Sequence, residues 1–201
     1  MFNLTSMLLT LPIVLLSLTV HEFAHALTAN VLGDPTPRWQ GRLTLNPLAH
    51  LDPIGTLVLI LTRRFGWAKP VPINPAYFKD WRTGMALVGV SGPLSNVVLA
   101  FIFALPYRLD IRLPYHLDLI AYLAILINLG LASFNLIPIP PLDGSRLLLA
   151  FLRGKNLYIY HQLERYGQLI LLILVFTGAI SVLMMPIMRF LAYIVTGYRL
   201  F

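Results

Sequence analysis

The sequence contains no cysteine and very little charge. Of its 201 residues, 11% are charged, whereas a soluble domain carries roughly 25%. The absence of cysteine excludes disulfides, thiolate metal ligands and a cysteine nucleophile. The shortage of charge accompanies 58% hydrophobic residues and a mean hydropathy of +0.77. This composition indicates an integral membrane protein, whose partner is the lipid bilayer.

The charge that is present is mostly positive, with a net value of +7. In a soluble protein this excess could indicate nucleic-acid binding. Here the basic residues lie mainly in loops between apolar runs, which is the pattern of the positive-inside rule. We therefore expect no nucleic-acid partner.

Four apolar segments are long enough to cross a membrane, because a helix needs about 20 residues to do so. They cover about residues 7–32, 85–107, 119–138 and 168–188. The shorter run from Ile54 to Leu61 is predicted to be re-entrant or interfacial, and the residues after Arg189 to form a short interfacial piece. The predicted fold class is an all-α polytopic membrane protein with about four transmembrane helices. With no internal repeat and no stretch long enough for an appended module, the chain is predicted to be a single domain over 1–201.

Loop charge predicts the orientation in the cell membrane. Eleven of the fifteen basic residues lie between the first and second spans or between the third and fourth. Placing these loops in the cytoplasm leaves four basic residues outside and puts both termini on the extracytoplasmic side. The N-terminus lacks the basic region of a signal peptide, so we expect the first apolar run to be retained.

The first apolar segment contains an H-E-x-x-H motif formed by His21, Glu22 and His25. Ionisable groups inside a membrane segment are costly and usually mark a functional site. On a helix the two histidines lie one turn apart on one face. That spacing suits two imidazole ligands to one zinc ion, with Glu22 beside them as general base.

A zinc site of this kind needs a third protein ligand. The best candidate is Asp143, which follows the third span in N-L-I-P-I-P-P-L-D-G over residues 135–144. The prolines are predicted to end the helix and to let an irregular segment turn back into the bundle. The only glutamate besides Glu22 is Glu164, in the loop before the fourth span, so a glutamate as third ligand is the weaker alternative.

Taken together, these motifs resemble those of the site-2 protease family of intramembrane zinc metalloproteases, peptidase family M50. The resemblance rests on His21-Glu22-x-x-His25 and on the second motif, which is similar to N-x-x-P-x-x-x-x-D-G. It also rests on S-G-P-L-S-N over residues 91–96 and on the segments 41–55 and 66–75, which are similar to the compact bacterial and archaeal branch. The chain lacks the PDZ domain that some relatives carry between spans.

The resemblance implies one Zn²⁺ held by His21, His25 and Asp143, with Glu22 as the catalytic base. It implies hydrolysis of peptide bonds in transmembrane protein substrates, in regulated intramembrane proteolysis, at a site that opens toward the cytoplasm. Two asparagines are further candidates. Asn96 is either a donor to the oxyanion or a residue that pairs helices, and Asn135 is either a substrate-backbone clamp or a helix-end cap.

Three loop features keep two interpretations each. The segment 69–75, which its prolines prevent from being helical, is a short extended loop that either pairs with an unwound substrate as a β-edge or serves as a stiff connector. His50 and Asp52 could orient a metal-bound imidazole, but Asp52 precedes Pro53, so we favour turn and cap roles.

Two other functions use the same residues. In a metal-ion or proton transporter, the intramembrane histidines and aspartate would carry ions, and Glu22 would not be needed as a base. In a non-catalytic regulator that binds membrane helices, part of the H-E-x-x-H or Asp-Gly motif would normally be lost, whereas both are complete here.

Overall fold

The computed structural model describes residues 4–55, 57 and 68–197. The described part is helical and contains an isolated antiparallel β-bridge between Leu51 and Ala68. The predicted re-entrant run from Ile54 to Leu61 falls largely outside the described residues. The helices of the described part include α1 Leu4–Val31, α2 Thr36–Trp39, η1 Pro47–Ala49, η2 Pro75–Tyr77, α4 Trp81–Arg108, α5 Tyr115–Asn135, α6 Asp143–Leu149, α7 Lys155–Phe176 and α8 Ala179–Thr196.

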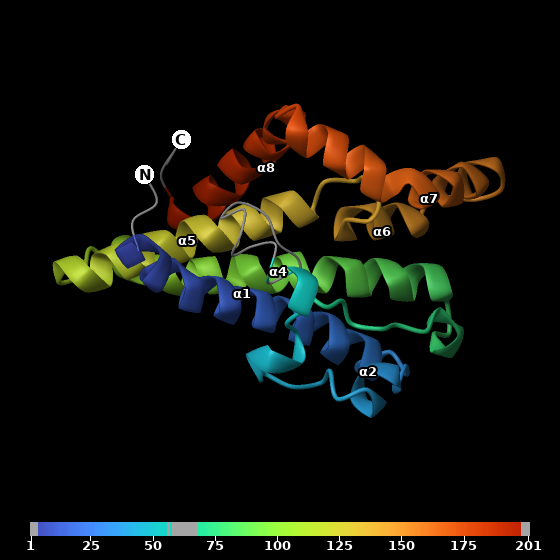
Figure 1. Ribbon diagram of the computed structural model, residues 1–201, viewed down its shortest axis with the longest axis horizontal. Coiled ribbons are helices and arrows are strands. Elements are labelled where there is room, and N and C mark those ends of the chain that lie inside the picture. Colours follow the sequence, from blue (N-terminus) through green and yellow to red (C-terminus); the bar gives the residue numbers. More distant parts are fainter. Residues whose placement is uncertain (1–3, 56, 58–67, 198–201) are drawn as a thin grey trace.

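Three long helices, α1, α4 and α5, lie side by side, and α8 packs against α4 and α5 (Figure 1). The core between α4, α5 and α8 is built largely from alanine and branched aliphatic side chains. Small residues let membrane helices approach closely, so that van der Waals contact can hold them together. The buried members are Ala100, Ala104, Ile125, Leu129, Ala132, Leu191, Ala192 and Val195.

Four helices in the described part are long and apolar enough to span a membrane: Leu9–Val31, Trp81–Arg108, Tyr115–Asn135 and Ala179–Thr196. The chain is therefore a multi-pass membrane protein, as its composition predicts. The first three predicted spans coincide with α1, α4 and α5.

The predicted fourth span, 168–188, is wrong as a single helix. Its residues are divided between α7, which ends at Phe176, and α8, which begins at Ala179. Gly178 lies between them in the left-handed region, with φ 75°, a conformation that ends helices and that glycine adopts without strain. The residues after Arg189 likewise do not form a separate interfacial piece, because α8 continues through them to Thr196.

The loop between α1 and α4 is held against the helices by a buried carboxylate. Asp34 accepts hydrogen bonds from the backbone N–H groups of Thr36 (2.9 Å) and Asn74 (2.7 Å). Residues 69–74 are neither helical nor part of a strand, and Ile73 packs beside Ala29 and Val88. Substrate pairing along this segment stays a prediction.

In Figure 1, α1 begins and α8 ends at the same end of the bundle. The end of α1, the start of α4 and the short helix α6 lie at the opposite end. The chain therefore leaves α1 and α5, and enters α4, at the end of the bundle where α6 lies.

Candidate metal centre

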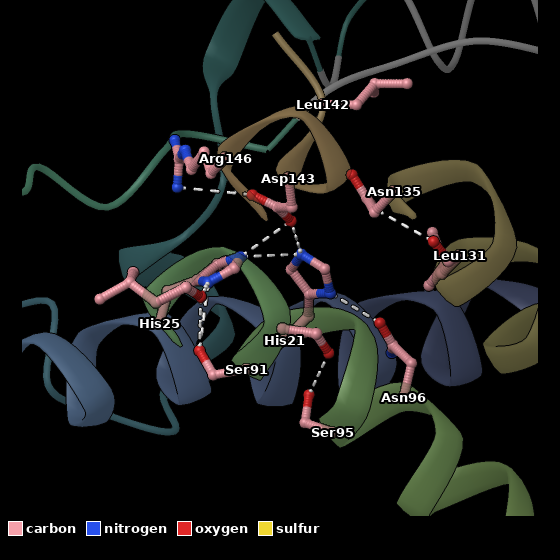
Figure 2. A network of polar contacts seen from close by, with 12 residues as sticks. His21, His25, Ser91, Ser95, Asn96, Leu131, Asn135, Leu142, Asp143 and Arg146 are labelled. Carbon is pink, nitrogen blue, oxygen red and sulfur yellow. Dashed lines mark hydrogen bonds and ion pairs between the residues drawn. The ribbon is translucent and has the colours of Figure 1, made fainter. Parts of the chain in front are cut away.

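Three side chains from α1 and α6 converge on one point. His21 Nε2 lies 3.1 Å and His25 Nε2 3.0 Å from Asp143 Oδ2, and the two Nε2 atoms are 3.1 Å apart (Figure 2). All three residues are buried. Among the described residues, they form a group that could hold a metal ion.

The two histidines meet because α1 is regular through the motif. Residues four apart lie one above the other on a helix, and the two rings are in edge contact, with centroids 4.7 Å apart and planes at 89°. His25 lies six residues before the end of α1 and His21 ten, which is about 9 Å and about 15 Å along the axis. The two histidines therefore lie about two to three turns before the end of α1, a helix that is long and apolar enough to span a membrane.

Asp143 reaches the histidines because the chain after α5 turns back. Helix α5 ends at Asn135, three residues before Pro138, and Asp143 begins α6. The turn is tight. A Cβ on Gly144 would overlap the carbonyl of Leu136, and a Cβ on Gly89 of α4 would lie 2.8 Å from the carbonyl oxygen of Asp143. Glycine at both positions therefore lets α6 pack closely against α4 and the end of α5.

Gly92 makes room for the two imidazoles. A Cβ at this position would overlap His25 Nε2 and would lie 2.7 Å from His21 Cε1. Gly92 belongs to the S-G-P-L-S-N motif of residues 91–96, so this part of the motif has a direct steric explanation.

Hydrogen bonds at the far side of each ring fix its tautomer. His25 Nδ1 donates to the carbonyl oxygen of Val88 (2.7 Å), and His21 Nδ1 donates to Oδ1 of Asn96 (2.6 Å). A neutral imidazole carries one proton, so both Nε2 atoms are left as lone-pair donors facing Asp143. Partners of this kind are typical behind metal-binding histidines.

The cluster as a whole requires a cation. With neutral imidazoles, it consists of two nitrogen lone pairs and a carboxylate oxygen that cannot hydrogen-bond to one another. Either a proton on an imidazole or a metal ion must join them. Two histidines and one carboxylate are a donor set typical of catalytic zinc, and ligands of a tetrahedral zinc lie about 3.4 Å apart. The observed spacings of 3.0–3.1 Å are close to that value, so the residues fit the ion.

Arg146 holds the other oxygen of the carboxylate. Its Nη1 lies 3.4 Å from Asp143 Oδ1, three residues earlier on α6. Asp143 therefore directs one carboxylate oxygen at the two histidines and the other at Arg146.

The remaining candidates divide into those near the cluster and those apart from it. Glu22 is half-buried beside the cluster, and its carboxylate has no hydrogen bond within the part of the chain that the structure describes. Asn135 donates from Nδ2 to the carbonyl of Leu131 (3.0 Å), which is the contact of a helix-end residue. A substrate contact of Asn135 stays a prediction.

Asn96 lies behind His21 rather than in front of the cluster. Its Nδ2 already donates to Ser17 O (3.2 Å) and Asn128 Oδ1 (2.9 Å). Because both of its N–H groups are engaged, these contacts favour a role in holding His21 and pairing helices over donation to an oxyanion.

His50, Asp52 and Glu164 do not join the group. His50 Nε2 donates to Thr44 O (2.9 Å), and Asp52 accepts from Gly55 N (2.7 Å), as turn residues do. Glu164 is exposed and pairs with His161 at 3.3 Å. The structure thus separates Glu164 from the histidines of α1 and leaves Asp143 as the carboxylate at the site.

Two residues of the site carried weak signals in the sequence. Arg146 follows Asp143 by three residues, a spacing that places both on one helix face. Asn128 is an amide within an apolar span, where a polar group usually has a partner, but the sequence does not say which.

Comparisons with known proteins identify the family of the chain. The model for Peptidase family M50 matches residues 114–178, which contain α5, α6 and α7. "Putative zinc metalloprotease YwhC" of Bacillus subtilis (strain 168) is 42% identical over 183 residues, which are 87% of this chain and 83% of YwhC. The chain belongs to peptidase family M50.

Two further relatives are similar to the chain over shorter lengths. "Putative zinc metalloprotease Rip2" of Mycolicibacterium smegmatis is 34% identical over 83% of this chain and 66% of Rip2. "Putative zinc metalloprotease MJ0611" of Methanocaldococcus jannaschii is 37% identical over 46% of this chain and 49% of MJ0611. No solved structure matches the chain significantly. The protein is a membrane-embedded zinc metalloprotease of family M50, and its resemblance to the site-2 proteases is confirmed.

Proposed function

We propose that this M50 metalloprotease cleaves transmembrane proteins within or near the bilayer, in regulated intramembrane proteolysis. In this proposal, His21, His25 and Asp143 hold the zinc ion, and Glu22 is the general base. The observation that carries it is the depth of the cluster. The two histidines lie about 9–15 Å inside α1, a helix long and apolar enough to span the membrane, and Asp143 is brought to the same depth by the turn after α5.

Bound zinc would supply a Lewis acid and lower the pKa of a coordinated water to about 7. The residues of the chain transfer the proton and orient the metal ligands. Glu22, adjacent to His21 in sequence and half-buried, takes the proton of the attacking water and returns it to the leaving amine. Asn96 and the Val88 carbonyl keep both imidazoles in the tautomer whose Nε2 faces the metal, and Arg146 keeps Oδ2 of Asp143 directed at them.

The side from which the site is reached follows from the loops around it. The cluster lies toward the end of the bundle at which α1 ends and α4 begins. The sequence segments between α1 and α4 and between α5 and α8 carry most of the basic residues, and the positive-inside rule supports a cytoplasmic position for them. The site then opens toward the cytoplasm, and a product released there is soluble in it.

Zinc content tests the ligand set. We expect about one zinc per chain in the detergent-purified protein by elemental mass spectrometry, and loss of zinc in His21→Ala and Asp143→Ala. His161→Ala is the matched control, because it removes a histidine that also pairs with a carboxylate, at an exposed site away from the cluster. Full zinc content in Asp143→Ala would remove Asp143 from the ligand set.

Cleavage tests the reaction. In proteoliposomes containing single-span model proteins with a glycine- or proline-weakened helix, wild type should cut inside the apolar segment, as mass spectrometry of the fragments would show. Glu22→Gln should keep its zinc and lose cleavage. Cuts confined to the water-exposed flanks would contradict the intramembrane part of the proposal, and undiminished cleavage by Glu22→Gln would contradict the role of Glu22.

A further inference from the structure

A chain of buried side-chain hydrogen bonds joins α5 to the metal centre through α4. Asn128 of α5 and Asn96 of α4 are both fully buried. Asn128 contacts Asn96 (2.9 Å), and Asn96 contacts His21 (2.6 Å) on the side of the ring that faces away from Asp143 (Figure 2 shows the second contact).

The direction of each hydrogen bond is fixed by the backbone at both ends. Asn128 donates from Nδ2 to the carbonyl oxygen of Ala124 (2.9 Å), so its Oδ1 faces Asn96 and can only accept. Asn96 therefore turns its Nδ2 toward Asn128, and the same Nδ2 also donates to Ser17 O (3.2 Å). This leaves Oδ1 of Asn96 facing His21 Nδ1, which must carry the proton.

We propose that Asn128, acting through Asn96, is a positioning residue that holds His21 in the tautomer able to bind the metal. If the Asn96 amide rotated by half a turn, its N–H would face Nδ1 and the proton of a neutral His21 would move to Nε2. A protonated Nε2 has no lone pair for a metal. Asn128 disfavours that rotation, because it would place the two amide oxygens against each other. The inference rests on the proposed function in one respect, that His21 holds the zinc.

The membrane environment increases the need for a fixed amide orientation. At a protein surface, water can hydrogen-bond to an amide in either orientation, whereas a buried amide in a membrane helix has only protein partners. The alternative explanation is that the Asn96–Asn128 contact merely pairs two helices. The chain offers a comparison for that case, because Tyr107 of α4 also bonds to α5, donating to Asp118 Oδ1 (2.9 Å) at a distance from the metal centre.

The test compares Asn128→Leu with Tyr107→Phe, each of which removes side-chain hydrogen bonding between α4 and α5. Zinc affinity of the detergent-purified proteins is measured by competition with a chromogenic chelator. Tyr107→Phe should bind zinc as wild type does. Asn128→Leu should bind about 2- to 10-fold more weakly, the value of one net hydrogen bond, and Asn96→Leu about 10- to 100-fold more weakly, as for other groups that orient metal ligands.

A spectroscopic measurement reports the tautomer directly. In zinc-free wild type with ¹⁵N-labelled histidine rings, at alkaline pH, the His21 signal should show the proton on Nδ1, with the signal assigned through His21→Gln. Asn128→Leu should shift part of that signal toward the Nε2–H form, and Tyr107→Phe should not. An Nε2–H tautomer in wild type would overturn the inference even if Asn128→Leu did not fold.

The two proposals can fail separately. If wild type and His21→Ala hold the same zinc, the ligand set is wrong. If His21→Ala loses zinc, but Asn128→Leu keeps both the wild-type zinc affinity and the Nδ1–H tautomer of His21, the ligand set stands and Asn128 is a helix-pairing residue.

Discussion

Arg146 holds the carboxylate oxygen of Asp143 that the histidines do not use, across 3.4 Å. Replacing it with methionine keeps much of the aliphatic stem but frees Oδ1, so the carboxylate can rotate. We expect zinc affinity to fall by about 10- to 100-fold in Arg146→Met, the range for partners that orient metal ligands. Arg153→Met is the control, because Arg153 is exposed beyond α6. Equal losses in both variants would show that only net charge near the site matters.

Protons should compete with the metal at the same atoms. Both Nε2 atoms must be free of protons to bind zinc, and binding releases any proton present. Zinc affinity should therefore fall as the pH is lowered from about 8 to about 5.5, because the metal must displace each proton that an imidazole has taken up at Nε2. Isothermal titration in buffers of different ionisation heat measures the protons released. Affinity independent of pH in this range would mean that the histidines are not the ligands.

At the scale of elements, α4 can approach α1 closely at the metal centre because residue 92 is glycine. A methyl group at Gly92 would overlap His25 and press on His21. Gly92→Ala should therefore weaken zinc binding by on the order of 10-fold or more, even though alanine is the better helix former by about 1 kcal/mol.

Gly130→Ala is the matched control for this variant. Gly130 lies in α5, and a Cβ there would meet nothing within 4 Å, so the substitution should leave zinc affinity unchanged. Zinc binding by chelator competition and helix content by circular dichroism separate the two effects. Wild-type affinity in Gly92→Ala would mean that the helices can move apart without loss of the site.

The sequence predicts elements where a single local signal decides them. Apolar length is sufficient for α1, α4 and α5, and the spacing of His21 and His25 is sufficient for their shared face. Prediction from apolar length fails at Gly178, because the residues on both sides of the helix break are apolar and hydropathy does not indicate a change of helix direction. The sequence does not decide the role of Asn96, because that role depends on Ser17 and Asn128, which contact Asn96 only after three helices have packed.

At the scale of the whole molecule, orientation is the main prediction that remains to be tested. The start of α1 and the end of α8 lie together at one end of the bundle, which agrees with an even number of membrane crossings. The distribution of lysine and arginine predicts which end faces the cytoplasm, with the loops before α4 and after α5 as the cytoplasmic ones.

The lack of cysteine makes this prediction simple to measure, because any introduced thiol is unique. In whole cells, a membrane-impermeant maleimide should label a cysteine at Asp110, in the short loop between α4 and α5, and should spare one at Arg153, in the loop before α7. After the membrane is permeabilised, both should react, which controls for burial of either thiol. The reverse pattern would place the metal centre on the extracytoplasmic side. A soluble fragment would then leave the membrane away from the cytoplasm, so the route proposed for the product depends on this result.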